Sequence, residues 1–161
     1  MILAAGLGTR LKPLTDNVPK ALVPFQGVPM LEMIILKLLD AGVEKIVVNI
    51  HHLADQVIDF MESRNYFDTK VILSDERDLL RDTGGGVLKA RSLLEDDDPF
   101  ILYNVDVHTD LDINKLFNFH RENGALATIA VSSRKTSRTL LFDEDGCLAG
   151  WQHEITGEKK S

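Results

Sequence analysis

The chain has 161 residues, of which 44% are hydrophobic and 27% are charged, and its formal net charge at pH 7 is -7. That length suits one domain with a substantial core, and the composition argues against disorder. The negative charge argues against nucleic acid or an anionic membrane surface as the main partner, because both favour a basic face. Since no apolar run approaches the roughly 20 residues needed to span a bilayer, we expect a cytoplasmic protein. The lone Cys147 excludes an intrachain disulfide.

The first half of the chain alternates short apolar runs with helical patterns. Met1–Ala5 is predicted to be a buried strand that ends in a glycine-rich loop. Pro29–Ala41 is predicted to be a helix, because apolar residues recur at helical spacing and proline suits a first turn. Lys45–Ile50 and Lys70–Ser74 are predicted to be strands on either side of a helix over Leu53–Glu62.

The second half continues the alternation and then changes to a hairpin pattern. The acidic run Glu95–Asp98 is predicted to be a solvated turn. The other predicted elements are a helix over Gly86–Leu94, a strand over Pro99–Tyr103, a helix over Ile113–Glu122, a strand over Ala125–Ser132, and a hairpin of Thr139–Phe142 with Cys147–Trp151.

Alternating strands and helices predict an α/β fold: a Rossmann-like, doubly wound mixed sheet, mostly parallel, with an antiparallel hairpin near the C-terminus. In such sheets, ligands bind beyond the carboxyl ends of the strands. The loops after Ala5, Ile50, Ser74 and Tyr103 are therefore expected to converge on one crevice.

The loop after the first strand carries the strongest functional pattern. Gly6 and Gly8 let backbone N–H groups approach phosphate oxygens, and Thr9 adds a hydroxyl donor. Arg10 offers a guanidinium fork for phosphate, and Lys20 offers a second, more mobile positive charge. Two cations beside a glycine loop indicate a polyphosphate site.

Other phosphate-binding loops fit this pattern less well. A dinucleotide-binding loop has a third glycine and runs directly into a helix, whereas Pro13 interrupts this one. The second strand ends in Asn49 and not in an acidic ribose ligand, and the Gly-Lys-Ser/Thr of a Walker loop is absent. A plain glycine turn with two surface cations explains Gly6 and Gly8 alone but not the whole string.

The string GLGTRLKPLT…PKAL resembles the signature of the sugar-1-phosphate nucleotidyltransferase family, which includes thymidylyl-, guanylyl- and uridylyltransferases. The resemblance extends through Asn49–Leu53, Ser74–Glu76, Leu80–Gly86 and Tyr103–Asp106, which are similar to later family motifs in the right order. The Thr-Gly-Gly-Gly form in Leu80–Gly86 looks closest to bacterial uridylyl- and guanylyl-transferring members.

The resemblance implies the nucleotide-diphospho-sugar transferase fold and a Mg²⁺-dependent reaction of an NTP with a sugar-1-phosphate. It implies catalytic roles for Arg10 and Lys20, and it implies that Asp106 binds the Mg²⁺ ion. The nucleotide-binding residues that it implies are Leu3, Ala4, Ala5, Gly6, Leu7, Gly8, Thr9, Arg10, Thr83, Gly84 and Gly85.

The chemistry agrees with that assignment. The phosphate of a sugar-1-phosphate is already an anion at neutral pH, so positioning and charge neutralisation are most of the catalysis. Mg²⁺ prefers hard oxygen ligands, and Asp106 follows the predicted fourth strand closely. Read alone, Asp106 also suits a strand-end turn. Asp75 with Glu76 suits a second acidic site, a loop near the base or sugar, or a surface loop. His51 and His52 are adjacent on a strand end, where side chains point oppositely, which argues against a metal pair.

Family members run well beyond 161 residues and have a second metal-binding aspartate in their later part, for which this chain has no convincing match. We therefore expect 1–161 to be a single nucleotidyltransferase domain that lacks its C-terminal part and turns over poorly. A cytidylyltransferase acting on a phosphate such as phosphocholine, and a nucleotide-binding regulatory module, stay open as alternatives. A homodimer is also left open.

Overall fold

The computed structural model describes residues 1–94 and 99–160, and it divides into two compact units, Met1–Phe117 and Asn118–Ser161. The expected acidic turn at Glu95–Asp98 lies outside the described residues. Within the described ranges, every helix is too short or too polar to cross a bilayer.

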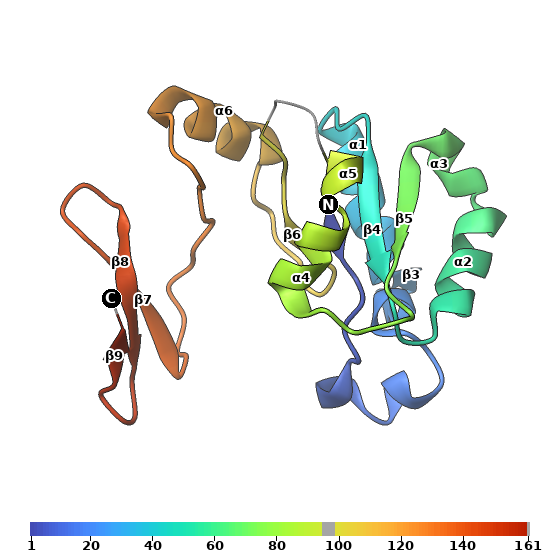
Figure 1. Ribbon diagram of the computed structural model, residues 1–161, viewed down its shortest axis with the longest axis horizontal. Helices are drawn as coiled ribbons and strands as arrows, with labels where there is room; N and C mark the ends of the chain where they lie inside the picture. The colour runs from blue at the N-terminus through green and yellow to red at the C-terminus, as the bar shows by residue number, and fades with distance from the viewer. Residues whose placement is uncertain (95–98, 161) are drawn as a thin grey trace. The chain divides into compact units, whose positions relative to one another are not determined.

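A parallel sheet forms the centre of the first unit (Figure 1). Its strands are β1 (Ile2–Leu3), β4 (Ile46–Ile50), β5 (Val71–Asp75) and β6 (Tyr103–Asn104), in the spatial order β5-β4-β1-β6. The chain therefore builds outward from β1 in one direction and then returns to β1's other edge, which makes the sheet doubly wound. This arrangement confirms the predicted fold class and places the reversal of strand order between β1 and β6.

One face of the sheet packs on α1 (Met30–Asp40) and α2 (Ala54–Ser63). Successive side chains of a strand alternate between faces, and Ile46, Val48 and Ile50 of β4 all join this cluster. Both helices supply further members of this cluster. These include Leu31, Ile34, Ile35 and Leu38 of α1 with Val57 and Met61 of α2.

The opposite face packs on α4 (Asp82–Lys89) and α5 (Arg91–Leu94), which lie in front of the sheet in Figure 1. Val47 points into this smaller cluster together with Ala90. By the same alternation, Asn49 belongs to this face, where it is a polar residue 3% exposed.

Shorter elements complete the first unit. The 3-10 turns η1 (Thr9–Leu11), η2 (Leu14–Asp16) and η3 (Lys20–Leu22) lie in the segment after β1. A small hairpin of β2 (Pro24–Phe25) and β3 (Val28–Pro29) precedes α1. Between α2 and β5, α3 (Asn65–Thr69) is a turn whose residues all have positive φ. At the end of the unit, α6 (Ile113–Asn123) continues into the second unit.

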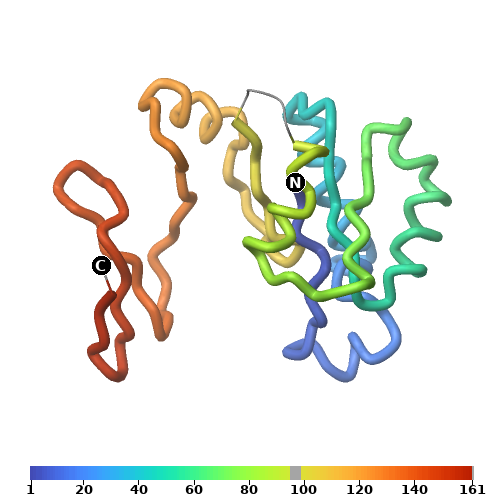
Figure 2. The backbone as a smooth tube through the Cα atoms, viewed as in Figure 1, coloured from blue at the N-terminus to red at the C-terminus, as the bar shows by residue number. Residues whose placement is uncertain are grey.

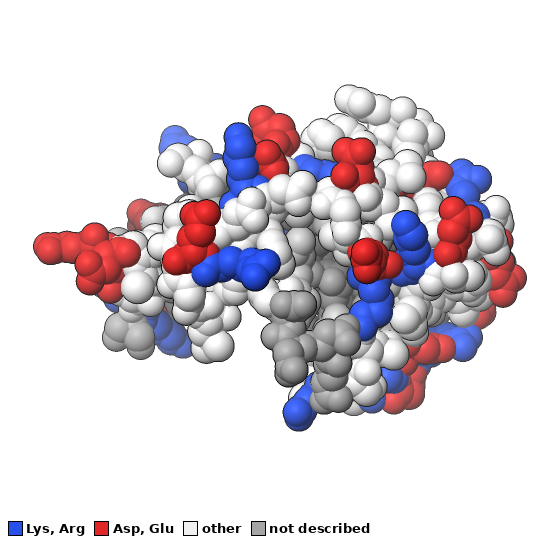
Figure 3. Space-filling view, turned by 90° about the horizontal axis from the view of Figure 1, so that it is seen from above, with Lys and Arg blue, Asp and Glu red and all other residues white. Residues whose placement is uncertain are grey.

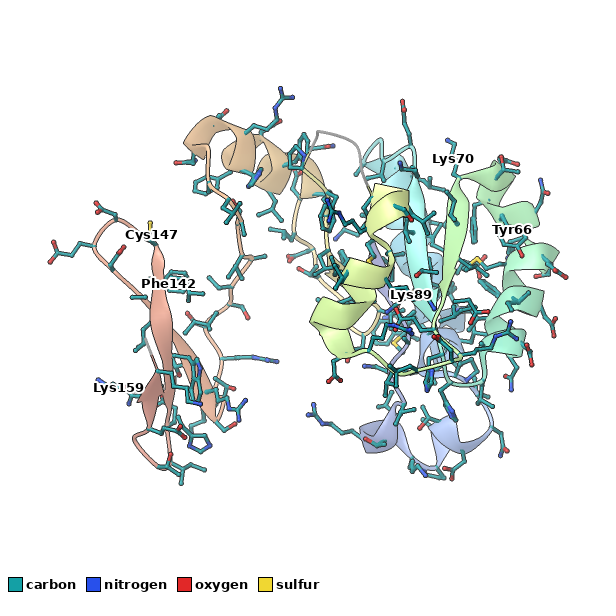
Figure 4. All side chains as sticks on the ribbon, in the orientation of Figure 1. Tyr66, Lys70, Lys89, Phe142, Cys147 and Lys159 are labelled. Atoms are coloured by element: carbon teal, nitrogen blue, oxygen red, sulfur yellow. The ribbon has the colours of Figure 1, made fainter. Side chains whose placement is uncertain are left out.

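The second unit holds an antiparallel sheet of β7 (Arg138–Phe142), β8 (Leu148–His153) and β9 (Lys159–Lys160). Its β7–β8 hairpin confirms the predicted one. At the hairpin tip, Asp143 Oδ1 accepts hydrogen bonds from the backbone of Asp145 and Cys147. The charged groups of Arg138 and Lys160 lie 5.0 and 5.7 Å from the centre of the Trp151 ring. Figure 4 labels Phe142 and the exposed Cys147.

The strand predicted over Ala125–Ser132 is wrong, because no strand of the described residues includes this segment. Leu126 is fully exposed and Val131 is 60% exposed. Strand formation depends on cross-strand partners more than on backbone preference. This segment finds no paired neighbour among the described residues of its own unit, so the backbone stays irregular.

Candidate active site

A cavity of about 340 Å³ lies in the first unit at the carboxyl ends of β1 and β6, where the strand order reverses. We call it the switch-point cavity. Its lining residues are Leu3, Ala5, Gly6, Leu7, Gly8, Thr9, Lys20, Asn49, Glu76, Leu80, Asp82, Thr83, Asn104, Val105 and Asp106. Figure 2 shows the segments after β1 and after β5 at the same end of the sheet. The predicted convergence therefore holds for the segments after β1, β5 and β6, whereas β4 contributes Asn49 from within the strand.

The glycine loop is fixed by a contact that the sequence did not indicate. Thr15, 1% exposed, donates a hydrogen bond from Oγ1 to the carbonyl oxygen of Gly8 at 2.8 Å. Gly8 has φ +66°, and a Cβ there would lie 2.8 Å from Thr15 Cγ2. Glycine is required at this position for both its backbone conformation and its close packing.

Lys20 and Asp106, far apart in the sequence, meet in the cavity wall. Lys20 Nζ lies 2.5 Å from Asp106 Oδ2, and the two side chains are 20% and 47% exposed. Lys20 begins η3, while Asp106 follows β6, so the fold brings the predicted phosphate-binding cation to the predicted metal-binding carboxylate. A positive and a negative group thus face the same space as the glycine loop.

Other predicted residues lie beside the cavity and not in its lining. Arg10 is exposed in η1 and is absent from the lining, as are Ala4, Gly84 and Gly85. Thr83 does line the cavity, from the first turn of α4. The helix predicted over Gly86–Leu94 begins earlier, at Asp82, so the glycines lie within α4 and not in a loop before it.

A buried polar bridge in the cavity wall joins the ends of β1, β4 and β5. Asn49 Oδ1 accepts hydrogen bonds from the backbone N–H groups of Ala4 at 2.7 Å and Ala5 at 3.3 Å. Asn49 Nδ2 donates to Glu76 Oε1 at 2.9 Å. Since β1 pairs with β4 only as far as Leu3, this side chain extends the hydrogen bonding of β1 to the point where the glycine loop begins.

Glu76 is the fully buried end of that bridge. Its backbone N–H donates to Ile50 O at 2.8 Å, and its carbonyl oxygen accepts a hydrogen bond from His51 Nδ1 at 2.7 Å. Its Oε2 has no hydrogen-bond partner among the described residues. A buried oxygen without a partner is costly, and this residue lines the cavity. His51 thus has a structural contact with the segment after β5.

The segment between β5 and α4 is held by exposed ion pairs. Arg81 donates to both carboxylate oxygens of Asp78, at 2.8 and 2.7 Å, and Lys89 donates to Asp78 at 3.0 Å. Hydrogen bonds from Arg81 and Lys89 hold the pKa of the Asp78 carboxyl well below its usual range. Asp78 takes the guanidinium of Arg81, and Asp82 lines the cavity. Figure 4 labels Lys89 on α4, and Figure 3 shows acidic and basic side chains interspersed on one face.

The acidic residues of the site fit a metal ion that takes other ligands from its substrate. Within the described part of the chain, no three His, Cys, Asp or Glu side chains group closely enough to hold a metal by themselves. Asp106 supplies one accessible carboxylate. Mg²⁺ typically binds one or two carboxylates together with phosphate oxygens and water, so this donor set suits it.

A glycine loop, a lysine and a carboxylate at the switch point of a doubly wound sheet form an arrangement typical of phosphate-binding α/β proteins. Comparison with known families agrees, because the model of the nucleotidyl transferase family matches residues 1–140. The chain belongs to this family.

Relatives in the family transfer guanylyl or uridylyl groups, according to their names. The mannose-1-phosphate guanylyltransferase catalytic subunit beta of Drosophila pseudoobscura pseudoobscura is 35% identical, over 92% of this chain and 41% of its own length. The N-acetylmuramate alpha-1-phosphate uridylyltransferase of Caulobacter vibrioides is 41% identical, over 66% of this chain and 44% of its own length. The chain thus spans less than half the length of these relatives.

A solved structure shares the fold over nearly the whole chain. HddC from Yersinia pseudotuberculosis, crystallised with GMP-PN, superposes with a TM-score of 0.73 at 27% identity. The match covers 98% of this chain and 69% of that one.

Proposed function

We propose that this chain carries the nucleotide side of a sugar-1-phosphate nucleotidyltransferase, which converts an NTP and a sugar-1-phosphate into an NDP-sugar and pyrophosphate. The observation that carries the proposal is the switch-point cavity, where the loop from Gly6 to Thr9 meets Lys20 and Asp106. The names of the relatives support the reaction type.

In this proposal, the backbone of Leu3, Ala5 and Gly6 lines the base and ribose pocket, together with Thr83. Gly8 and Thr9 bind phosphate oxygens through backbone N–H groups and a hydroxyl. Arg10 is exposed beside the cavity, and we assign it to the departing pyrophosphate. Two points support this assignment. The arginine side chain is long and begins in η1, beside the cavity, and its guanidinium is a strong phosphate ligand.

The reaction joins two anions. An oxygen of the sugar-1-phosphate forms a bond to the α-phosphorus of the NTP, and the bond to the bridging oxygen breaks to release pyrophosphate. The attacking oxygen is already ionised, so the chain needs no general base. Lys20 offsets negative charge at the reacting phosphates, which is where electrostatic stabilisation contributes most.

Mg²⁺ is part of this proposal, and Asp106 is the side chain that would hold it. When bound, the ion neutralises phosphate charge and orients phosphate oxygens. The partial exposure of Asp106 leaves its carboxylate accessible to such an ion.

We also propose that Glu76 favours GTP or UTP over CTP. Its unpaired Oε2 needs a donor, and the rings of guanine and uracil each carry an N–H, whereas the corresponding ring nitrogen of cytosine is an acceptor. A preference for GTP or UTP would argue against the cytidylyltransferase alternative.

Pyrophosphate release tests the function directly. GTP, UTP, CTP and dTTP would each be assayed with Mg²⁺ and a panel of sugar-1-phosphates and phosphocholine, using both this chain and a full-length relative as positive control. Release with a sugar-1-phosphate supports the proposal, even at a low rate. Release with phosphocholine and CTP alone supports the cytidylyltransferase instead, and nucleotide binding without turnover supports a regulatory module. We place this reaction in the cytoplasm, and light scattering would test for a homodimer.

A further inference from the structure

The bridge from β1 through Asn49 to Glu76 forms part of the wall of the cavity in which the base pocket is proposed. Asn49 occupies a position that the strand pattern otherwise fills with an apolar side chain, because its neighbour on the same face, Val47, packs into the small cluster under α4 and α5. Both the oxygen and the nitrogen of the Asn49 side-chain amide are hydrogen bonded. The oxygen accepts from the Ala4 and Ala5 backbone, and the nitrogen donates to Glu76.

Gly86 shows that α4 is built around this bridge. A Cβ at Gly86 would lie 2.9 Å from Asn49 Nδ2 and 2.9 Å from Glu76 Oε1. The helix therefore approaches the two hydrogen-bonded atoms as closely as glycine allows, and it leaves them little room to turn. The bridge is enclosed by β1, β4, β5 and α4.

We propose that Asn49 is a positioning residue that sets nucleotide selectivity. By fixing Oε1 of Glu76, it determines that Oε2 is the oxygen left for a ligand, and it fixes the backbone from which the glycine loop starts. One side chain thus couples the wall that contacts the base to the loop that contacts the phosphates. This inference rests on the proposed function.

Substitutions that exchange an oxygen for a nitrogen, or the reverse, across the bridge test this inference, because they hardly change the volume of the side chains. Asn49→Asp keeps an acceptor for Ala4 but sets a carboxylate oxygen against Glu76. Glu76→Gln keeps an acceptor for Asn49 and turns the remaining oxygen into an N–H donor. In the Asn49→Asp/Glu76→Gln double variant, the new amide nitrogen can donate to the new carboxylate, which again leaves an oxygen as the unpaired acceptor.

The readout is selectivity, defined as the ratio of the weakest to the tightest Kd among GTP, UTP, CTP and dTTP, measured by calorimetry with Mg²⁺. Thermal unfolding of each variant is measured in parallel. We expect Asn49→Asp to reduce selectivity about tenfold or more, since a hydrogen bond to a charged group is involved. We expect the double variant to regain it to within about threefold, a rescue that a purely structural role would not give.

Unchanged selectivity in folded Asn49→Asp overturns the inference, as does a double variant that is no more selective than Asn49→Asp. Where Asn49→Asp does not fold, Glu76→Gln is compared with the double variant, and equal selectivity of those two overturns the inference. If the unsubstituted chain binds none of the four nucleotides, the proposed function itself fails. Selective binding by the unsubstituted chain with no effect of the exchange refutes only the role of Asn49.

Discussion

Replacing Gly86 with alanine should destabilise the first unit, although alanine is the better helix former. Gly86 lies within α4, and a Cβ there would lie 2.9 Å from both Asn49 Nδ2 and Glu76 Oε1. Ordinary contacts of a Cβ begin at 3.4 Å. Neither Asn49 nor Glu76 can move away easily. The Asn49 side chain accepts a hydrogen bond from Ala4 at 2.7 Å, and both the N–H and the carbonyl group of the Glu76 backbone are hydrogen bonded.

The cost has three parts. Overpacking a buried site costs about 1–3 kcal/mol, and separating the Asn49–Glu76 hydrogen bond costs about 1–3 kcal/mol more, because both groups stay buried. The higher helix propensity of alanine offsets about 1 kcal/mol of this loss of stability. The expected loss is therefore about 3 kcal/mol, or roughly a 10 °C fall in Tm for a unit of this size.

Gly84→Ala is the matched control. Gly84 lies in the same helix, and a Cβ added there would meet nothing within 4 Å. The variant should gain stability by up to about 1 kcal/mol from helix propensity alone. Thermal unfolding followed by circular dichroism compares the two variants. Equal melting temperatures for Gly84→Ala and Gly86→Ala would refute the close approach of α4 to the bridge.

Three further outcomes are expected. Lys20→Met should bind Mn²⁺ about fivefold more tightly in the absence of nucleotide, because a partly exposed ion pair worth about 1 kcal/mol no longer competes for Asp106; calorimetry giving equal or weaker binding would contradict this. Thr15→Val should lower the free energy of unfolding by about 1 kcal/mol, because the Gly8 carbonyl oxygen loses one of its two donors and keeps only the Leu11 N–H; an unchanged urea midpoint would count against that contact. Arg10→Ala should weaken pyrophosphate binding without changing Tm, since its side chain is exposed; unchanged pyrophosphate affinity would remove Arg10 from the proposed site.

The sequence predicted most of the sheet and the helices that cover it, because their apolar patterns are regular. The helix expected over Pro29–Ala41 is α1, from Met30 to Asp40, and the strand expected over Lys45–Ile50 is β4, from Ile46 to Ile50. The glycine loop with Lys20 and Asp106 was also recognisable, because their residue types and order carry the pattern. The fold then brings that lysine and aspartate together.

Contacts that depend on tertiary structure were not predictable in the same way. An asparagine at a strand end has several uses, and only the close approach of Gly86 and the burial of Glu76 show what Asn49 does. Thr15 looks like an ordinary loop residue until its hydrogen bond to Gly8 is seen. The largely apolar segment Ala125–Ser132 is predicted to be a strand, but a strand also needs a partner that local sequence does not specify.

The central claim is that the switch-point cavity binds a nucleoside triphosphate, and amide chemical-shift mapping tests it most directly. GTP and UTP, each with Mg²⁺, would be titrated into the isotopically labelled chain. We predict the largest shifts at the backbone amides of Gly6, Gly8, Thr9 and Thr83, with smaller ones at Asn49 and Glu76. Saturating shifts confined to other parts of the chain, or no shifts with any nucleotide at millimolar concentration, would contradict the claim.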